Sequence, residues 1–433
     1  MNLDEWSSHD LSSLIAELES GSRPKGGADD ESGELPSLGG ENIRSDGRLD
    51  VSSVRKIPRS FFAAMSKGLL RMDDVLINKD GANTGKVGLY RGEFSEAAIN
   101  EHVFRLRGRE GKLHQRFLFY FLASQLGQQH IRSRISGSAQ PGLKSNFVDQ
   151  LPIALPNNYD VQPTVATILE FVDRAIEQTE ALQAKQQRIK RGLIHDLLTR
   201  GLDVQGRLRN PSTHAFKPSP LGPIPSEWTV VNVEDMCDDI VDCPHSTPKY
   251  EAGGVPCIRT ADMVPGKLLL QNAYRVSLST YKERVARLVP RDGDIIYSRE
   301  GERLGIASPV GDELVCLGQR VMLLRPKAET NSTFLMWAMN SPSFYNRVVL
   351  GQIATTSPHI NVRDIKKALV VRPEPTEQQL IGEALAADDS ARAALETSLD
   401  KLRRQKGGLI HDLLTGLVSV TPLLSNPRAS ISS

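Results

Sequence analysis

The octapeptide GLIHDLLT occupies residues 192–199, and the same eight letters return at residues 408–415. An identical repeat of this length is implausible as a coincidence in a chain of 433 residues. The copies lie 216 residues apart, the difference between 408 and 192, which is far above the few dozen residues of a solenoid repeat. The sequence therefore predicts a duplicated domain rather than an array of small units.

The likeness between the two halves extends well beyond the octapeptide. Three pairs of segments align without gaps: EW (5–6) with EW (227–228), DDVLINKDGANTG (73–85) with GDIIYSREGERLG (293–305), and FLFYFLAS (117–124) with FLMWAMNS (334–341). Short β-type runs that end at glycine predict strands joined by turns. The long apolar runs alternate too little for an edge strand and predict a buried helix. We therefore expect a mixed α+β domain of about 150 residues in each half.

Each half ends in a predicted long helix that is almost free of proline and glycine and runs to the octapeptide. The second helix shows a coiled-coil seam with alternating spacings of four and three residues: Ile381, Leu385, Asp388, Arg392, Leu395, Leu399, Leu402, Lys406, Leu409 and Leu413. The first shows a looser version: Val165, Leu169, Val172, Ile176, Leu182, Ile189, Leu193 and Leu197. Neither helix can bury its stripe alone, so each is expected to pair with the other. Asp388 and Arg392 would then fix the register of the pair.

These patterns divide the chain into six segments. They are a globular domain at 1–156, a long helix at 157–200, a linker at 201–221, a second globular domain at 222–373, a second long helix at 374–416 and a tail at 417–433. The linker is rich in Gly, Pro and Ser and shows no hydrophobic periodicity. The expected fold class is α+β, with two mixed globular domains related by duplication and separated by two long helices.

Composition indicates an ordinary globular chain, because 39% of the residues are hydrophobic and 24% are charged. The amino terminus lacks the basic and apolar regions of a signal peptide. The apolar run FLFYFLA (117–123) is far shorter than the roughly 18 residues that a membrane span requires. We therefore expect a cytoplasmic protein with no membrane partner. The four cysteines form no CxxC pair, which favours reduced, buried thiols over a zinc site.

The net charge of +1 hides an uneven distribution along the chain. Residues 1–39 hold nine acidic and two basic residues, whereas residues 40–148 hold eighteen basic and ten acidic residues. Segments 111–148 and 330–363 contain no Asp or Glu at all. Such segments predict local positive surfaces suited to phosphate contacts, although an ordinary solvated face can show the same pattern.

The common catalytic signatures are absent from the sequence. The loop GANTGKVG (81–88) lacks the GxxxxGK[ST] spacing of a phosphate-binding loop, and its counterpart GERLGIAS (301–308) has no lysine. His195 and Asp196 are neighbours on a helix, so their side chains point to different faces and form no catalytic pair. The tetrapeptide with which amino-methyltransferases position a target base is also missing. The sequence therefore predicts a chain that is not an enzyme and has no catalytic residue or metal site.

Two related domains at a fixed separation match a bipartite DNA site, because protein geometry then sets the distance between the half-sites. The alternative interpretation is a scaffold, in which the coiled coil binds protein partners and the globular domains do not bind DNA. Binding to a DNA duplex that weakens steeply with salt would separate the two interpretations.

The chain resembles the specificity subunit of a type I restriction-modification system. The resemblance covers residues 5–416 and rests on the repeated order of domain, long helix and GLIHDLLT; the most family-like stretches are QQRIKRGLIHDLLTRG (186–201) and LRRQKGGLIHDLLTG (402–416). It implies two target recognition domains for double-stranded DNA and an antiparallel coiled coil that docks two modification (methyltransferase) subunits. Restriction (translocase and nuclease) subunits would join this core. S-adenosylmethionine, ATP and Mg²⁺ would be bound by the partner subunits, with no cofactor in this chain.

Candidate DNA contacts come from a comparison of the two halves. Three aligned pairs keep a basic side chain in both halves and are predicted to contact phosphates: Lys79 with Arg299, Arg107 with Arg325, and His102 with Arg320. The aligned polar loops SGSAQPGLK (136–144) and ATTSPHINVR (354–363) differ in side chains that can address base edges, unless both are plain turns. These side chains are Gln140, Ser357 and His359. The other basic candidates are Lys86, Arg132, Arg134, Lys144, Arg303, Arg347 and Arg363.

Overall fold

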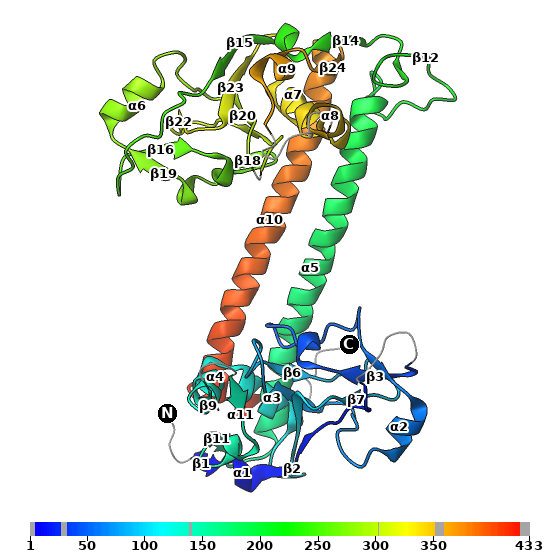
Figure 1. The fold of residues 1–433 in the computed structure, drawn as a ribbon, viewed down its shortest axis with the longest axis vertical. Helices are drawn as coiled ribbons and strands as arrows, with labels where there is room; N and C mark the ends of the chain where they lie inside the picture. The colour runs from blue at the N-terminus through cyan, green and yellow to red at the C-terminus, as the bar shows by residue number, and fades with distance from the viewer. Residues whose placement is uncertain (1–4, 27–32, 138–140, 302, 351–358, 425–433) are drawn as a thin grey trace. The chain divides into compact units, whose positions relative to one another are not determined.

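The computed structural model describes residues 5–26, 33–137, 141–301, 303–350 and 359–424 (Figure 1). The chain divides into two compact units, one formed by Met1–Thr179 with Ser398–Ser433 and the other by Glu180–Thr397. These units do not coincide with the two sequence repeats. Each unit contains one globular domain, the first part of one long helix and the last part of the other.

The first globular domain is built on two small sheets. An antiparallel sheet has the strand order β2 (Ile15–Ser20), β8 (Val103–Gly108), β5 (Val75–Asn78) and β6 (Val87–Leu89). A mixed sheet has the order β4 (Lys56–Ile57), β3 (Leu35–Leu38) and β7 (Ala98–Ile99). The other elements are β1 (Trp6–Asp10), α1 (Leu11–Leu14), η1 (Gly40–Asn42), α2 (Arg59–Ala64), α3 (Gln115–Ala123), α4 (Gln125–Arg132), β9 (Ile135–Ser136), β10 (Gly142–Leu143), η2 (Ser145–Val148) and β11 (Pro152–Pro156). Strand β1 pairs with β11 and so ties the start of the domain to its end.

The second globular domain repeats this plan. Its antiparallel sheet has the order β15 (Cys237–Asp242), β23 (Val321–Pro326), β20 (Ile295–Ser298) and β21 (Ala307–Pro309), and its mixed sheet has the order β19 (Tyr274–Val276), β16 (Val255–Ile258) and β22 (Cys316–Leu317). Strand β14 (Thr229–Asn232) pairs with β24 (Leu369–Arg372), as β1 does with β11. The other elements are β12 (Phe216–Lys217), β13 (Ile224–Pro225), η3 (Val233–Met236), η4 (Thr260–Asp262), β17 (Met263–Val264), β18 (Lys267–Leu268), η5 (Leu270–Asn272), α6 (Leu278–Arg284), α7 (Ser332–Met339), α8 (Pro342–Val348) and α9 (Val362–Lys366). The predicted duplication and the α+β class are confirmed.

In each domain the apolar run forms the predicted buried helix, and a second helix follows directly after it. In the first domain, α3 ends at Ala123 and α4 begins at Gln125. Ser124 lies between them and its hydroxyl accepts a hydrogen bond from the backbone N–H of Gly127. Such an N-cap satisfies a helix-terminal donor, so the serine at the end of the apolar run starts a new helix. Ser341 and Pro342 make the same break between α7 and α8.

The two long helices are α5 (Val161–Thr199) and α10 (Pro375–Leu414), and they run antiparallel within each unit. In the first unit, Lys406 Nζ lies 2.6 Å from Asp173 Oδ1. In the second unit, Lys190 forms an ion pair with Asp389 and lies 3.8 Å from Asp388. The step from Asp173 to Lys190 along α5 equals the step from Lys406 back to Asp389 along α10. Both ion pairs therefore obey one antiparallel register.

The seam of α10 agrees with the sequence pattern, but part of the predicted α5 seam is wrong. Leu182 and Ile189 are 44% and 49% exposed. The inward positions in this part of α5 are polar instead, with Gln183 and Gln186 partly buried and Lys190 buried. The apolar pattern misleads here because the ion pair of Lys190, rather than a leucine, occupies the interhelix position.

The two octapeptides pack into the domain of the opposite repeat. Ile194, Leu197 and Leu198 of the first copy belong to the core of the second domain. Leu413 and Leu414 of the second copy belong to the core of the first domain. The repeated octapeptide therefore closes each domain with a helix end that comes from the other half of the sequence, an exchange that the sequence comparison did not predict.

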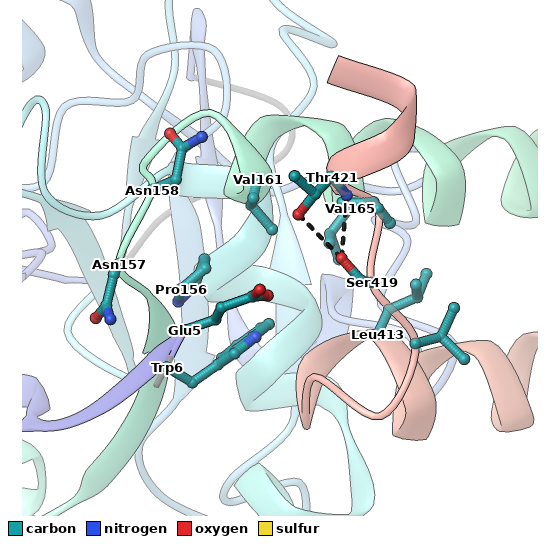
Figure 2. A pocket seen from close by; sticks show the side chains of 12 residues that line it. Glu5, Trp6, Pro156, Asn157, Asn158, Val161, Val165, Leu413, Ser419 and Thr421 are labelled. Atoms are coloured by element: carbon teal, nitrogen blue, oxygen red, sulfur yellow. Dashed lines mark hydrogen bonds between the residues drawn. The ribbon is translucent and has the colours of Figure 1, made fainter. Parts of the chain in front are cut away.

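A buried ion pair joins the linker to the start of α10 in the second unit. Glu377 accepts hydrogen bonds from both terminal nitrogens of Arg209, from the backbone N–H of Leu202 at 2.8 Å and from Trp228 Nε1 at 2.9 Å. The residue 216 positions before Glu377 is Val161, which cannot form this pair. In the first unit Val161 instead lines a cavity of about 270 Å³ beside Trp6 and Leu413 (Figure 2).

The substitution Glu377→Gln should strongly destabilise the second unit, because it leaves the Arg209 charge buried without its counterion. We expect a loss of about 3 kcal/mol or more. The urea midpoint of Trp fluorescence measures this loss, since Trp228 contacts the substituted side chain. Glu396→Gln, at an exposed position of the same helix, is the matched control and should change stability by less than about 0.5 kcal/mol. Equal midpoints for the two variants would contradict the structural role of Glu377.

Candidate nucleic-acid interface

Three loops of the first domain meet where β5 ends and β8 begins. The backbone N–H of Lys79 donates to the carbonyl of His102 at 2.9 Å, and that of Leu143 donates to the carbonyl of Lys79 at 2.6 Å. Gly81 N–H donates to the carbonyl of Pro141 at 3.2 Å. The segments 79–86, 100–102 and 141–144 therefore form one surface, which we call loop cluster 1.

The second domain gathers the equivalent segments in the same way. The backbone N–H of Arg299 donates to the carbonyl of Arg320 at 3.0 Å, and that of Ile360 donates to the carbonyl of Arg299 at 2.8 Å. We call the segments 299–305, 318–320 and 359–363, without residue 302, loop cluster 2. The structure thus brings the polar loops together with two of the three predicted basic pairs, although these lie far apart in the sequence.

Loop cluster 1 carries both free and paired basic groups. Lys144 is exposed and forms no ion pair with the described part of the chain. The Lys79 ammonium lies 5.4 Å from the ring centroid of Phe104. His102 is exposed, and its Nδ1 lies 2.6 Å from Asp80 Oδ1. Gln140 lies outside the described residues.

Loop cluster 2 presents different groups at its surface. Arg320 is 60% exposed, and Arg363 and His359 are exposed as well. Arg303 is exposed and donates from Nη1 to the carbonyls of Ala261 and Met263. Ser357 lies outside the described residues.

Arg299 differs from the Lys79 position with which it aligns. It is buried, and its guanidinium binds Asp242 at 2.9 Å and Glu300 at 2.7 Å. Two carboxylates therefore neutralise this charge, so Arg299 holds the loops together rather than presenting a cation to phosphate.

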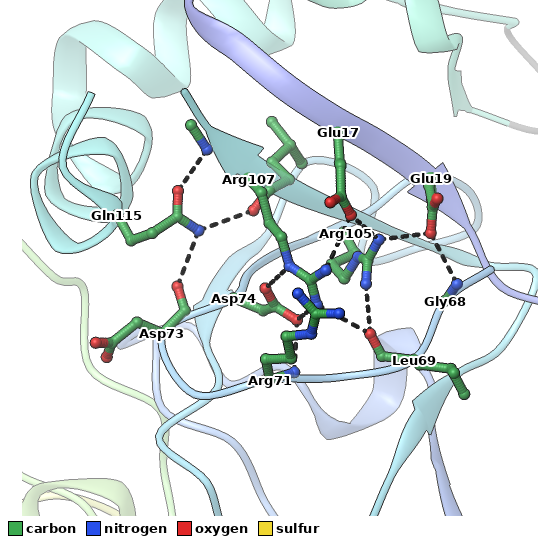
Figure 3. Close-up of polar contacts among 12 residues, drawn as sticks. Glu17, Glu19, Gly68, Leu69, Arg71, Asp73, Asp74, Arg105, Arg107 and Gln115 are labelled. Carbon is green, nitrogen blue, oxygen red and sulfur yellow. Dashed lines mark hydrogen bonds and ion pairs between the residues drawn. The ribbon is translucent and has the colours of Figure 1, made fainter. Parts of the chain in front are cut away.

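The third predicted pair, Arg107 and Arg325, lies at the opposite end of the sheet from the loop clusters. Arg107 forms a two-bond fork with Asp74, with Nε–Oδ1 at 2.6 Å and Nη2–Oδ2 at 2.8 Å (Figure 3). Arg325 forms the same fork with Asp294, at 2.9 and 2.7 Å. Burial opposes the charge of Arg107, but Asp74 and Glu17 outweigh it and raise the pKa of the guanidinium. Both arginines thus have a carboxylate partner within their own sheet, which does not favour the phosphate contacts predicted for them.

Three basic candidates lie outside the loop clusters, and Lys86 is the last residue of the first segment of loop cluster 1. Lys86 lines a cavity with Arg44 and Lys406, and so faces the last part of α10. Arg347 donates to the carbonyl of Leu369 at 3.1 Å. Arg132 is exposed at the end of α4, and Arg134 donates to the carbonyl of Gln150 at 2.6 Å. Only Arg132 and Arg134 lead directly into the loop 136–144.

Sequence comparison missed Arg259 and Tyr274, which lie next to loop cluster 2. A search for basic residues shared by both halves cannot find them, because Gly39 occupies the position of Arg259 in the first half. A difference between the halves could have identified them: each position carries a large cationic or aromatic residue in the second half and another residue type in the first.

The described part of the chain shows no cluster of three or more His, Cys, Asp or Glu that could hold a metal ion. All four cysteines are buried free thiols, and burial raises the pKa of Cys237 to about 12. His195 is exposed on α5 and forms no ion pair with the described residues. No helix among these residues is long and apolar enough to cross a membrane.

The two halves of the chain both match one family. A family model described as the type I restriction modification DNA specificity domain matches residues 4–187 and 225–403. The chain is also similar to the type I restriction enzyme MjaVIII specificity subunit of Methanocaldococcus jannaschii, at 23% identity over 361 residues, which cover 82% of this chain and 81% of that protein. A putative type I restriction enzyme MjaX specificity subunit of the same organism is 23% identical over 430 residues, covering 96% and 94%.

Solved structures share the same fold. The S subunit of a type I restriction-modification system from M. genitalium superimposes with a TM-score of 0.60 at 15% identity, covering 95% of this chain and 97% of that chain. A chain from a study of complex assembly and conformational transition of the type I R-M system gives a TM-score of 0.56 at 18% identity, with the same coverage. With two domains, two exchanged helices and a family match in both halves, the chain belongs to the type I restriction-modification DNA specificity subunits.

Proposed function

We propose that this specificity subunit reads a bipartite, asymmetric DNA sequence, with one half recognised by each loop cluster. The observation that carries the proposal is the convergence of basic and polar loops at the same edge of both domains. The frames of the two domains are equivalent, whereas the exposed side chains of the clusters differ. Equivalent frames with different side chains suit two half-sites of different sequence.

The cations at the surface of the clusters suit phosphate contacts, and the polar loop residues suit base contacts. In our proposal Lys79, His102 and Lys144 serve the first half-site, and Arg303, Arg320 and Arg363 serve the second. His359 can address a base edge from its exposed position beside Glu300. The proposal also retains Gln140 and Ser357 as base-reading candidates from the sequence alone.

The long helices are proposed to dock two modification subunits, joined by restriction subunits. Support comes from exposed apolar side chains on the part of α5 in the second unit, where Leu182 and Ile189 are 44% and 49% exposed. Exposed apolar side chains seven residues apart share one helix face, which suits a partner helix. The subunit itself is non-catalytic, and S-adenosylmethionine, ATP and Mg²⁺ would act on the partner subunits, in the cytoplasm.

Substitution of the exposed cations should weaken DNA binding without changing the sequence preference. We expect Lys144→Gln and Arg363→Gln each to lower affinity several-fold and to reduce the slope of log affinity against log salt by about 1. The matched control is Lys185→Gln, at an exposed position of α5 outside both loop clusters. Fluorescence anisotropy at several salt concentrations measures the slope. An unchanged slope in both loop variants would remove these residues from the interface.

Replacement of the second domain should change one half of the recognised sequence. The exchange of residues 229–372 for the same segment of a relative keeps Trp228 and the Glu377 ion pair, so the frame is preserved. We expect the methylated motif of the assembled complex to keep one half and its spacer length while the other half changes. A motif that changes in both halves, or in neither, contradicts independent reading.

Matched insertions into both long helices should lengthen the spacer of the DNA site. Each globular domain packs on parts of both helices, so a single insertion breaks the antiparallel register. Seven residues inserted after Gln183 and seven after Glu396 keep the seam and add about 10 Å, or roughly three base pairs. Insertion into α5 alone is the control and should abolish assembly. Methylation at the original spacing by the doubly lengthened chain would show that the helices do not set the spacer.

A further inference from the structure

An arginine–tyrosine stack lies beside loop cluster 2. The guanidinium carbon of Arg259 lies 3.6 Å from the ring centroid of Tyr274. Tyr250 meets the Tyr274 ring edge to face, with the ring centroids 4.8 Å apart. Tyr274 is 51% exposed, and the Arg259 side chain is 25% exposed. The stack is thus held by contacts among three side chains, and part of it remains accessible to solvent.

Hydrogen bonds connect this stack to the loop cluster. Arg303 donates to the carbonyls of Ala261 and Met263, which follow Arg259 closely in the chain. The backbone N–H of Gly318 donates to the carbonyl of Ile258 at 2.7 Å. Arg303 and Gly318, which bond to the chain on either side of Arg259, both belong to loop cluster 2. Arg259 therefore lies next to this cluster.

Asp262 fixes the orientation of the Arg259 guanidinium. Its carboxylate accepts from Nε at 3.0 Å, from Nη2 at 2.9 Å and from the backbone N–H of Arg259 at 2.9 Å. Asp262 is almost fully buried, so this anchor is rigid. The carboxylate occupies one edge of the guanidinium, which leaves the edge formed by Nη1 and the second proton of Nη2. That edge carries two parallel donors.

The first domain has the same turn without the stack. Gly39 stands in place of Arg259, and its backbone N–H donates to Asn42 Oδ1 at 2.9 Å as that of Arg259 does to Asp262. The position of Tyr274 is occupied by Arg55. The Arg107 and Arg325 forks recur in both domains, whereas the stack is present in the second domain alone. The stack therefore belongs to the variable chemistry of the second domain.

We propose that Arg259 is a specificity-determining residue that reads a guanine in the half-site of the second domain, with Tyr274 holding the guanidinium plane. Two parallel donors match the O6 and N7 acceptors of guanine in the major groove. The aromatic face and Asp262 restrict the side chain to one orientation, which favours discrimination between bases over contact with phosphate. This inference rests on the proposed recognition of DNA by loop cluster 2.

The test is selection of bound duplexes from a random DNA library by the full-length chain assembled with its modification subunit. Arg259→Ala should lower affinity for the wild-type site roughly ten- to hundredfold and remove a single guanine preference from one half of the motif. Arg259→Lys should lose the same preference, because lysine keeps the charge but not the two-donor edge. Tyr274→Leu should weaken that preference, and Tyr274→Phe should retain it.

Arg275→Ala is the matched control, because Arg275 lies next to Tyr274 on β19 and its side chain donates only to the carbonyl of Gly254 among the described residues. It should select the wild-type motif. The inference is overturned if Arg259→Ala selects the wild-type motif, or if it loses affinity for all duplexes equally and Arg259→Lys restores binding. A wild-type complex that selects no sequence would overturn the proposed function together with this inference, whereas the other two outcomes would overturn the inference alone.

Discussion

The structure depends on the packing of each octapeptide into the domain of the opposite repeat. Ile194, Leu197 and Leu198 complete one core, and Leu413 and Leu414 complete the other. Full burial of one such side chain contributes about 1.5–3 kcal/mol, so each helix end is a substantial part of the stability of its unit. Neither half of the sequence contains a complete domain core. This shared task gives a physical reason for two identical copies of GLIHDLLT.

A polar contact gives this exchange a defined register. Asp173 pairs with Lys406 in one unit and Asp389 with Lys190 in the other, at equivalent positions of the repeat. Each ion pair also contacts an aromatic residue of its own unit. The Tyr120 hydroxyl donates a hydrogen bond to Asp173 at 2.7 Å, and Lys190 Nζ lies 3.7 Å from the ring centroid of Trp337. Buried ion pairs add little net stability, but they penalise any other alignment because a shifted helix leaves a buried charge without a partner.

Much of this arrangement was predictable from the sequence, because the alignment of the two halves identifies the residues that both halves share. The aligned pairs Lys79 with Arg299 and His102 with Arg320 do converge with the polar loops. Comparison of the two halves does not show whether a shared basic residue contacts DNA or stabilises the fold. Arg107 and Arg325 each pair with a carboxylate of their own sheet, Asp74 or Asp294, and a sequence does not show which carboxylate faces which guanidinium. The exposure of Leu182 and the exchange of the octapeptides depend on tertiary packing, so the sequence pattern did not predict them.

The central claim is that the two loop clusters read two separate half-sites. The most direct measurement is the sequence selected from a random duplex library by the wild-type chain assembled with its modification subunit. We expect two short conserved blocks of different sequence, separated by a constant number of unspecified base pairs. A single continuous block, or two blocks at variable distance, would contradict it.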